Sequence, residues 1–222
     1  MPLNEAINIF LLVYASLFPI VNPVGGAPIF YSMTRHCSDR ERHTLARKVA
    51  VNGFLLLLGS LFVGSHVLEF FGITLPVVSI AGGLVVSAYA WRLLHASAER
   101  IEPNTTRPSG TPLLGPVDSF YPLTLPLTVG PGSISVAITL GSQRPTDSVA
   151  YPQLLLLGAA ATAGLLAIAL TIYVCYRFAE WIRATLGDSG TNVLVRLTAF
   201  FLLCIGIQIV WNGYKGLGGL AG

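Results

Sequence analysis

Long apolar runs separated by short polar stretches make up most of this chain. A run of about 18 to 25 residues with few charges is long enough to cross a lipid bilayer as a helix. The pattern predicts six such crossings, at residues 6–34, 49–70, 74–91, 119–142, 152–176 and 197–214. We therefore expect an all-α membrane protein with six transmembrane helices.

The first and fourth runs each contain a cluster of helix-breaking residues. The first run holds Pro19, Pro23, Gly25, Gly26 and Pro28, and the fourth holds Pro126, Gly130, Pro131 and Gly132. Proline removes a backbone donor and glycine costs about 1 kcal/mol relative to alanine in a helix. Backbone groups freed in hydrocarbon find no water, so such a break needs a protein or polar surround. We expect helices 1 and 4 to be broken near the midplane, the arrangement that points to a transporter's substrate site.

Basic residues predict the orientation in the membrane. Eleven lysines and arginines follow the first, third and fifth crossings, whereas two follow the fourth and sixth. Loops that stay in the cytoplasm carry the excess of positive charge. The prediction is an inner-membrane protein with both termini outside, in the periplasm of a Gram-negative cell.

Three crossings in each half make the two halves run through the membrane in opposite directions. Pro19 and Gly25 correspond to Pro126 and Gly132 at one common offset. The chain is thus predicted to hold two inverted three-helix repeats, residues 1–96 and 119–222. Residues 97–118, rich in Pro, Thr, Ser and Gly, form the predicted cytoplasmic linker.

Composition supports the membrane class, with 53% hydrophobic residues, 10% charged residues and a mean hydropathy of +0.70. A soluble globular domain carries about 25% charged residues. The net charge of +3 is spread over separate loops with no aromatic-rich basic motif, so we expect no nucleic-acid partner.

Each break starts a second half-helix whose first amides lack a partner and carry a partial positive charge. We expect Pro28 and Pro131 in these first turns, where a missing amide hydrogen is harmless. Free amides beside free carbonyls suit an amino acid zwitterion, and the uncharged side chains suit a neutral solute. An alternative is that the hydroxyls bond only to their own helix or to a neighbouring one. The candidate substrate-binding residues are Asn22, Pro23, Gly25, Gly26, Pro28, Thr124, Thr128, Gly130, Pro131, Gly132 and Ser133.

Few ionisable residues lie within the predicted crossings. His66 and Glu69 near the outer end of the second crossing, and Asp118 at the cytoplasmic mouth of the fourth, are weak candidates for coupling to H⁺ or Na⁺. Each also fits an interfacial residue that meets water. The three cysteines and four histidines show no ligand spacing. No nucleophile or phosphate-loop motif is present, so the sequence predicts no cofactor, no metal site and no enzyme activity.

Several segments together resemble one known family. They are residues 22–30, 40–42, 71–73, 81–84 and 122–134, which include both broken-helix motifs, and they extend over nearly the whole chain. The sequence is similar to the MarC family of bacterial and archaeal inner-membrane proteins. That resemblance implies a six-helix protein within the wider LysE-like exporter group, and the family includes members assigned as transporters of small neutral amino acids.

The first functional hypothesis is a secondary transporter of alanine, glycine, serine or threonine across the inner membrane. An ion gradient is the expected energy source because no phosphate loop is present. The second hypothesis is an assembly or stress protein that transports nothing and whose breaks serve packing. The third is an exporter of drugs or other amphiphiles, which would be expected to carry more aromatic residues at mid-span.

Overall fold

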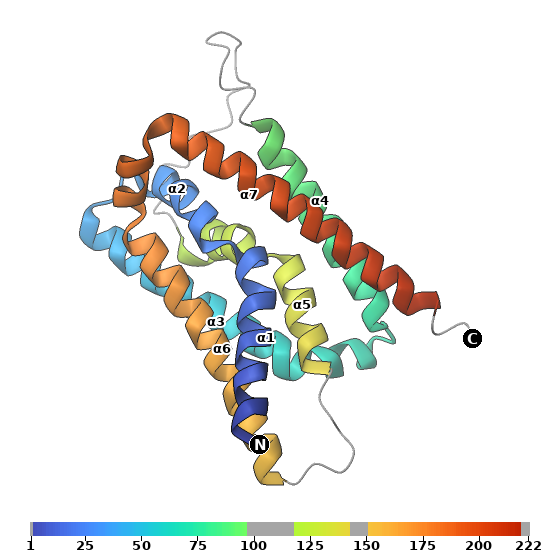
Figure 1. The fold of residues 1–222 in the computed structure, drawn as a ribbon. Coiled ribbons are helices and arrows are strands. Elements are labelled where there is room, and N and C mark those ends of the chain that lie inside the picture. Colours follow the sequence, from blue (N-terminus) through green and yellow to red (C-terminus); the bar gives the residue numbers. More distant parts are fainter. Residues whose placement is uncertain (1, 97–117, 143–150, 219–222) are drawn as a thin grey trace.

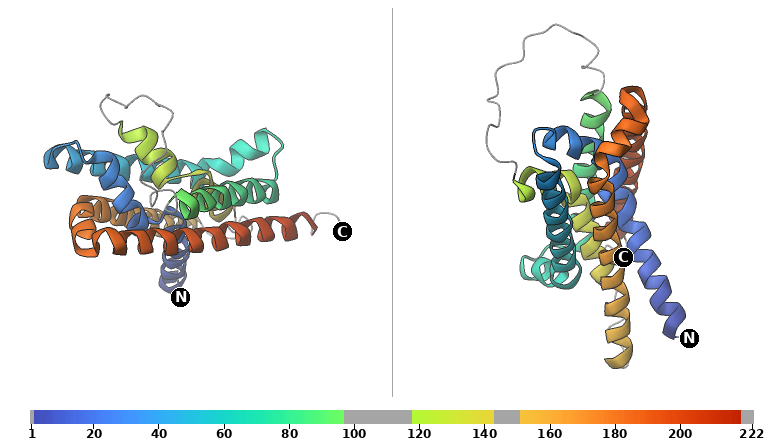
Figure 2. Two further views of the ribbon diagram at one scale, coloured as in Figure 1. Left: turned by 90° about the horizontal axis from the view of Figure 1, so that it is seen from above. Right: turned by 90° about the vertical axis from the view of Figure 1, so that its left-hand side faces the viewer.

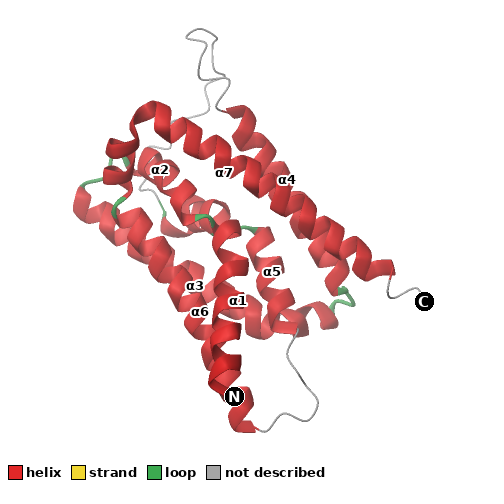
Figure 3. Cartoon of the chain, in the orientation of Figure 1, coloured by secondary structure: helices red, strands yellow, loops and turns green. Residues whose placement is uncertain are grey.

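The computed structural model describes residues 2–96, 118–142 and 151–218, and every regular element within them is a helix (Figures 1 and 3). Of the predicted linker at residues 97–118, all but Asp118 lies outside the described residues, as do both ends of the chain. The elements are α1 (Pro2–Val21), α2 (Pro23–Thr34), α3 (Asp39–Phe70), α4 (Leu75–Ala96), η2 (Ser119–Thr128), α5 (Pro131–Ser142), α6 (Tyr151–Arg177) and α7 (Ala179–Gly218).

Five helices in the described ranges are long and apolar enough to cross a membrane. These candidate spans are Leu3–Val21, Asp39–Phe70, Leu75–His95, Pro152–Arg177 and Ser189–Leu217. Large exposed side chains such as Leu170 and Phe200 cover their outer faces, as a lipid-facing surface requires. The remaining predicted crossing, residues 119–142, is divided between η2 and α5, and neither half is long enough to span a bilayer.

Both predicted breaks are present as interruptions between helices. The first predicted crossing is divided into α1 and α2, and the fourth into η2 and α5. The 20 residues of α1 are about 30 Å long, enough to cross the hydrocarbon before the break is reached. A break near the midplane therefore remains a prediction for the first crossing.

Short connections join successive helices. Ser38 caps α3 in a capping box with Glu41, in which each side chain bonds the other residue's backbone amide. At the far end, α3 stops before Gly72, whose φ of 67° suits glycine, and α4 begins at Leu75. Four residues thus reverse the chain between two long helices.

The helices pack around two apolar clusters. The larger cluster joins α1, α2, α3 and α6, and includes the buried residues Leu17, Phe30, Leu57 and Ile168. The smaller one lies between α4 and α7, which run side by side along one edge of the molecule (Figures 1 and 2). Glycines bring these two backbones together, because a Cβ on Gly83 would lie 2.7 Å from the Gly206 carbonyl oxygen.

Two expectations about helix starts need correction. The first turn of α2 holds Pro23 at its start, whereas Pro28 lies inside the helix. The last helix begins at Ala179 and is kinked at Gly187 (φ 64°), and its candidate span begins at Ser189, before the predicted residue 197.

Candidate functional site

The first break joins α1 to α2 through Asn22. Its backbone is left-handed (φ 48°, ψ 60°), a conformation that asparagine tolerates better than most residues. The Asn22 amide still donates to the Phe18 carbonyl at 2.9 Å, so α1 continues up to this residue. The Asn22 side-chain oxygen accepts a hydrogen bond from the Gly25 amide at 3.2 Å and caps α2, with Pro23 in the first turn. At this break the chain therefore turns a sharp corner, and the Asn22 side chain at the corner caps the helix that follows.

The second break has an irregular winding that prolines explain. Tyr121 and Leu125, each directly before a proline, are extended inside η2, with φ and ψ of −125° and 126°, and −108° and 127°. A proline ring clashes with the helical conformation of the preceding residue. Val129 is extended too, and its amide donates to the Thr124 carbonyl five residues back at 2.8 Å. As predicted, α5 then begins at Pro131.

The three hydroxyl candidates all donate to carbonyls of their own segment. Thr124 donates to Ser119 at 2.7 Å, Thr128 to Leu123 at 2.8 Å, and Ser133 to Gly130 at 2.9 Å. Of the two roles considered for these hydroxyls, bonding within their own segment is therefore observed. Their hydrogens stabilise the break and are not available to a ligand in this conformation.

Two neighbouring cavities adjoin the breaks. The cavity at the second break has a volume of about 330 Å³. The cavity at the first break is about 20 Å³, which admits roughly one water molecule. The larger is lined by the candidates Thr128, Gly130, Pro131, Gly132 and Ser133, and the smaller by Asn22, Gly25 and Gly26. Both share the wall residues Ile20, Tyr89, Leu127 and Leu202.

Arg92 lines the larger cavity and was not among the predicted site residues. Counting basic residues assigned it to a cytoplasmic loop, but α4 extends to Ala96 and carries Arg92 in its last turns, three residues after Tyr89 on the same face. Both ion pairs in the described part of the chain involve Arg42, so no described carboxylate neutralises Arg92. The lining of this cavity thus includes a positive charge, whereas uncharged side chains were expected around the breaks.

The remaining predicted residues lie elsewhere. Pro23, Pro28 and Thr124 are buried and line neither cavity. The coupling candidates His66, Glu69 and Asp118 are all exposed. Asp118 caps η2 by accepting from the Phe120 amide at 3.2 Å, and within the described residues no hydrogen bond joins His66 to Glu69.

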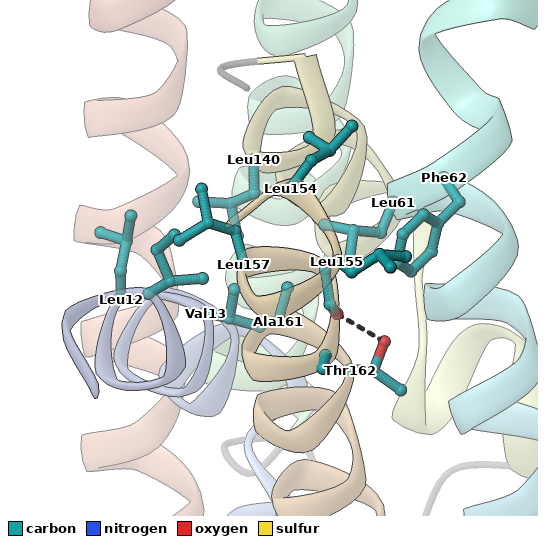
Figure 4. Close-up of a pocket in the computed structure, with 13 residues that line it drawn as sticks. Leu12, Val13, Leu61, Phe62, Leu140, Leu154, Leu155, Leu157, Ala161 and Thr162 are labelled. Carbon is teal, nitrogen blue, oxygen red and sulfur yellow. Dashed lines mark hydrogen bonds between the residues drawn. The ribbon is translucent and has the colours of Figure 1, made fainter. Parts of the chain in front are cut away.

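A third cavity, of about 390 Å³, lies between α1, α3, α5 and α6 (Figure 4). Leucines such as Leu12, Leu61 and Leu157 form its walls. Among the described residues that line it, Thr162 has the one polar side chain, and its hydroxyl donates to the Gly158 carbonyl at 2.8 Å. This cavity suits an apolar group and offers no partner for a charge.

The apolar spans, the broken helices and the cavities between them define a multi-pass helical membrane protein. The chain belongs to the MarC family, since it matches the MarC family integral membrane proteins over residues 7–217. It is a multi-pass inner-membrane protein of that family.

Relatives align over nearly their whole lengths. The chain is 31% identical to the UPF0056 membrane protein YhcE of Escherichia coli, over 94% of this chain and 93% of the relative. It is 28% identical to the UPF0056 membrane protein YvbG of Bacillus subtilis, over 92% and 93% of the two chains. It is also 28% identical to the UPF0056 inner membrane protein MarC of Salmonella paratyphi B, over 96% of each. Among solved structures, none matches this chain significantly.

Proposed function

We propose that this protein is a secondary transporter of small neutral amino acids that binds its substrate in the cavity at the second break. The supporting observation is the convergence of Arg92 and the start of α5 on one cavity. The first-turn amides of Gly132 and Ser133 have no acceptor within the helix, and the helix dipole makes this end positive. Together with the arginine they provide donors for one carboxylate.

The size and lining of the cavity favour a small substrate. Its volume of about 330 Å³ is near the lower end of the roughly 300–1,000 Å³ typical of ligand sites. Val85, Val86, Leu127 and Leu202 form apolar walls that suit a short side chain. No described carboxylate lines the cavity to pair with the side-chain ammonium of lysine, so lysine should be a poor substrate.

The proposal includes two inverted repeats, residues 1–96 and 119–222, with η2 and α5 together forming the fourth of six crossings. Helix pairing supports this symmetry, because α3 packs on α6 and α4 packs on α7, each helix with its counterpart in the other half. Both breaks lie in the interior of the molecule, where α2 and α5 begin (Figure 1). Gradient-driven transport by H⁺ or Na⁺ completes the proposal, with His66, Glu69 and Asp118 as coupling candidates.

Uptake of labelled alanine into proteoliposomes tests this function. We expect serine and glycine to compete strongly, leucine and phenylalanine weakly, and lysine hardly at all. Each misplaced methylene in such a pocket costs about 1 to 3 kcal/mol. Equal competition by lysine or leucine would contradict the proposed specificity, and a complete absence of uptake under H⁺ and Na⁺ gradients would favour a role without transport.

The apolar cavity in Figure 4 favours export of amphiphiles as a second candidate function. Its leucine walls would bind an acyl or aromatic group by hydrophobic burial alone. In the same proteoliposomes, an amphiphilic cation that is transported while alanine is not would support this function in place of amino acid transport.

The proposed orientation places both termini outside the cytoplasm. We expect a membrane-impermeant thiol reagent added to intact cells to label cysteines introduced at Asn4 and Leu217. A cysteine at His36 should be labelled only after the membrane is permeabilised. The reverse pattern would overturn the orientation.

A further inference from the structure

Tyr176, in the last turn of α6, lies between the two broken helices. Its side chain is fully buried and is the largest of the fully buried side chains in the described part of the chain. The hydroxyl oxygen lies 2.8 Å from the Thr128 hydroxyl oxygen of η2. The ring stacks on Phe30 of α2, with 4.5 Å between ring centroids and 17° between planes. One side chain therefore contacts both breaks.

The direction of the bond between Tyr176 and Thr128 follows from the number of hydrogens available. The Thr128 hydroxyl has one hydrogen and donates it to the Leu123 carbonyl at 2.8 Å. Tyr176 must then donate to the Thr128 oxygen. Two consecutive hydrogen bonds, from Tyr176 to Thr128 and from Thr128 to Leu123, thus hold the wide turn of η2 against α6.

Gly26 lies close to the same hydroxyl. A Cβ at this position would lie 2.7 Å from the Tyr176 hydroxyl oxygen, but 3.4 and 3.5 Å from the nearest ring carbons. Gly26 and Phe30 are four residues apart and so share one face of α2. The hydroxyl oxygen therefore sets how closely α2 approaches Tyr176, and this spacing requires glycine.

We propose that Tyr176 is a positioning residue, which sets the separation of the two broken helices and thereby the shape of the substrate site. Tyr176 lines neither cavity, but Thr128 lines the cavity at the second break and Gly26 lines the cavity at the first. Tyr176 acts through these two residues from behind the site. The effect on transport rests on the proposed function, whereas the geometric effect does not.

Tyr176→Phe removes the hydroxyl and keeps the ring on Phe30. In alanine uptake we expect KM to rise about fivefold, the equivalent of one neutral hydrogen bond, with little change in maximal rate. The matched control is Tyr14→Phe, which removes another tyrosine–threonine contact of α6, 3.3 Å from Thr171, away from the breaks. The control should leave KM unchanged. A KM unchanged in Tyr176→Phe, with uptake intact in wild type, overturns the proposal.

Gly26→Ala provides a test by compensation. The added methyl meets the Tyr176 hydroxyl, so we expect low yield or weak uptake from this variant alone. In Gly26→Ala combined with Tyr176→Phe, the missing oxygen leaves room for the methyl, and folding and uptake should recover. If the double variant behaves no better than Gly26→Ala, the hydroxyl does not set the spacing.

A readout without substrate separates this proposal from the proposed function. The variant Ser133→Cys, in a protein whose Cys37, Cys175 and Cys204 are replaced by serine, places a thiol in the wall of the larger cavity. We expect a small methanethiosulfonate reagent to react with it several-fold faster when Tyr176 is phenylalanine, and at the unchanged rate when Tyr14 is phenylalanine. An equal rate in all three proteins overturns the positioning role even if alanine is not the substrate.

Discussion

The two breaks arise from similar clusters of proline and glycine but differ in how they are completed. At the first break, Asn22 satisfies the Gly25 amide with its own side chain, and the adjoining cavity is about 20 Å³. At the second break, Ser133 donates to the Gly130 carbonyl, leaving the first-turn amides of α5 beside a cavity of about 330 Å³. The first break is closed by the chain itself, and the second adjoins the larger cavity, which we propose as the substrate site.

This difference indicates that a helix break and a binding site are separate properties. A break frees backbone donors and acceptors, which must then be satisfied by something. At the first break the side chain of Asn22 satisfies the Gly25 amide, and the chain forms a closed corner. At Gly130 the space beside the donors remains, and Arg92 from another helix adds a positive charge.

The largest expected effect is on the open break. Arg92→Gln should raise KM for alanine about tenfold or more, because a hydrogen bond to a charged group is worth roughly 1.5 to 3 kcal/mol. Arg92→Lys keeps the charge but loses the paired donors, so an intermediate KM is expected. Uptake kinetics in proteoliposomes provide the measurement.

The control for this prediction is Arg196→Gln. Arg196 is exposed, as Arg92 is, but it lies on α7 and lines neither cavity. Its KM should match wild type. If both glutamine variants lose the same activity, Arg92 acts through general charge and not through the cavity.

A medium effect is expected at the closed break, and it concerns stability. Asn22→Ala loses the cap and strains a left-handed backbone, which together cost about 1 to 3 kcal/mol. Asn22→Gly loses the cap but accepts the positive φ, so it should be the more stable of the two variants. Thermal unfolding in detergent compares them. Equal unfolding temperatures would show that the left-handed corner is not retained in the protein.

The smallest effect is expected for Ser133→Ala. Its hydroxyl donates within the break, so KM for alanine should change by less than about twofold, since substrate contacts come from the amides. A KM as high as that of Arg92→Gln would instead mean that the Ser133 hydroxyl binds substrate. Side chains, and not backbone amides, would then supply the substrate contacts at the second break.

The positions of the breaks were predictable from local chemistry. Proline has no amide hydrogen and restricts the residue before it, and these effects operate within a few residues of Pro23 and Pro131. The role of Pro28 was predicted wrongly, because the cap supplied by Asn22 starts α2 five residues earlier. Arg92 was assigned to a loop, because charge counting does not register a helix that continues past its apolar run.

The sequence by itself determined the membrane class, the family and the two interruptions, because hydropathy, proline and glycine act along the chain. Only the tertiary structure decided which break is open. Its cavity is bounded by Tyr89, Leu127 and Leu202 from three separate elements, and its supporting contact joins Thr128 to Tyr176. A cavity and the charges that line it come from residues distant in sequence, and only packing brings such residues together.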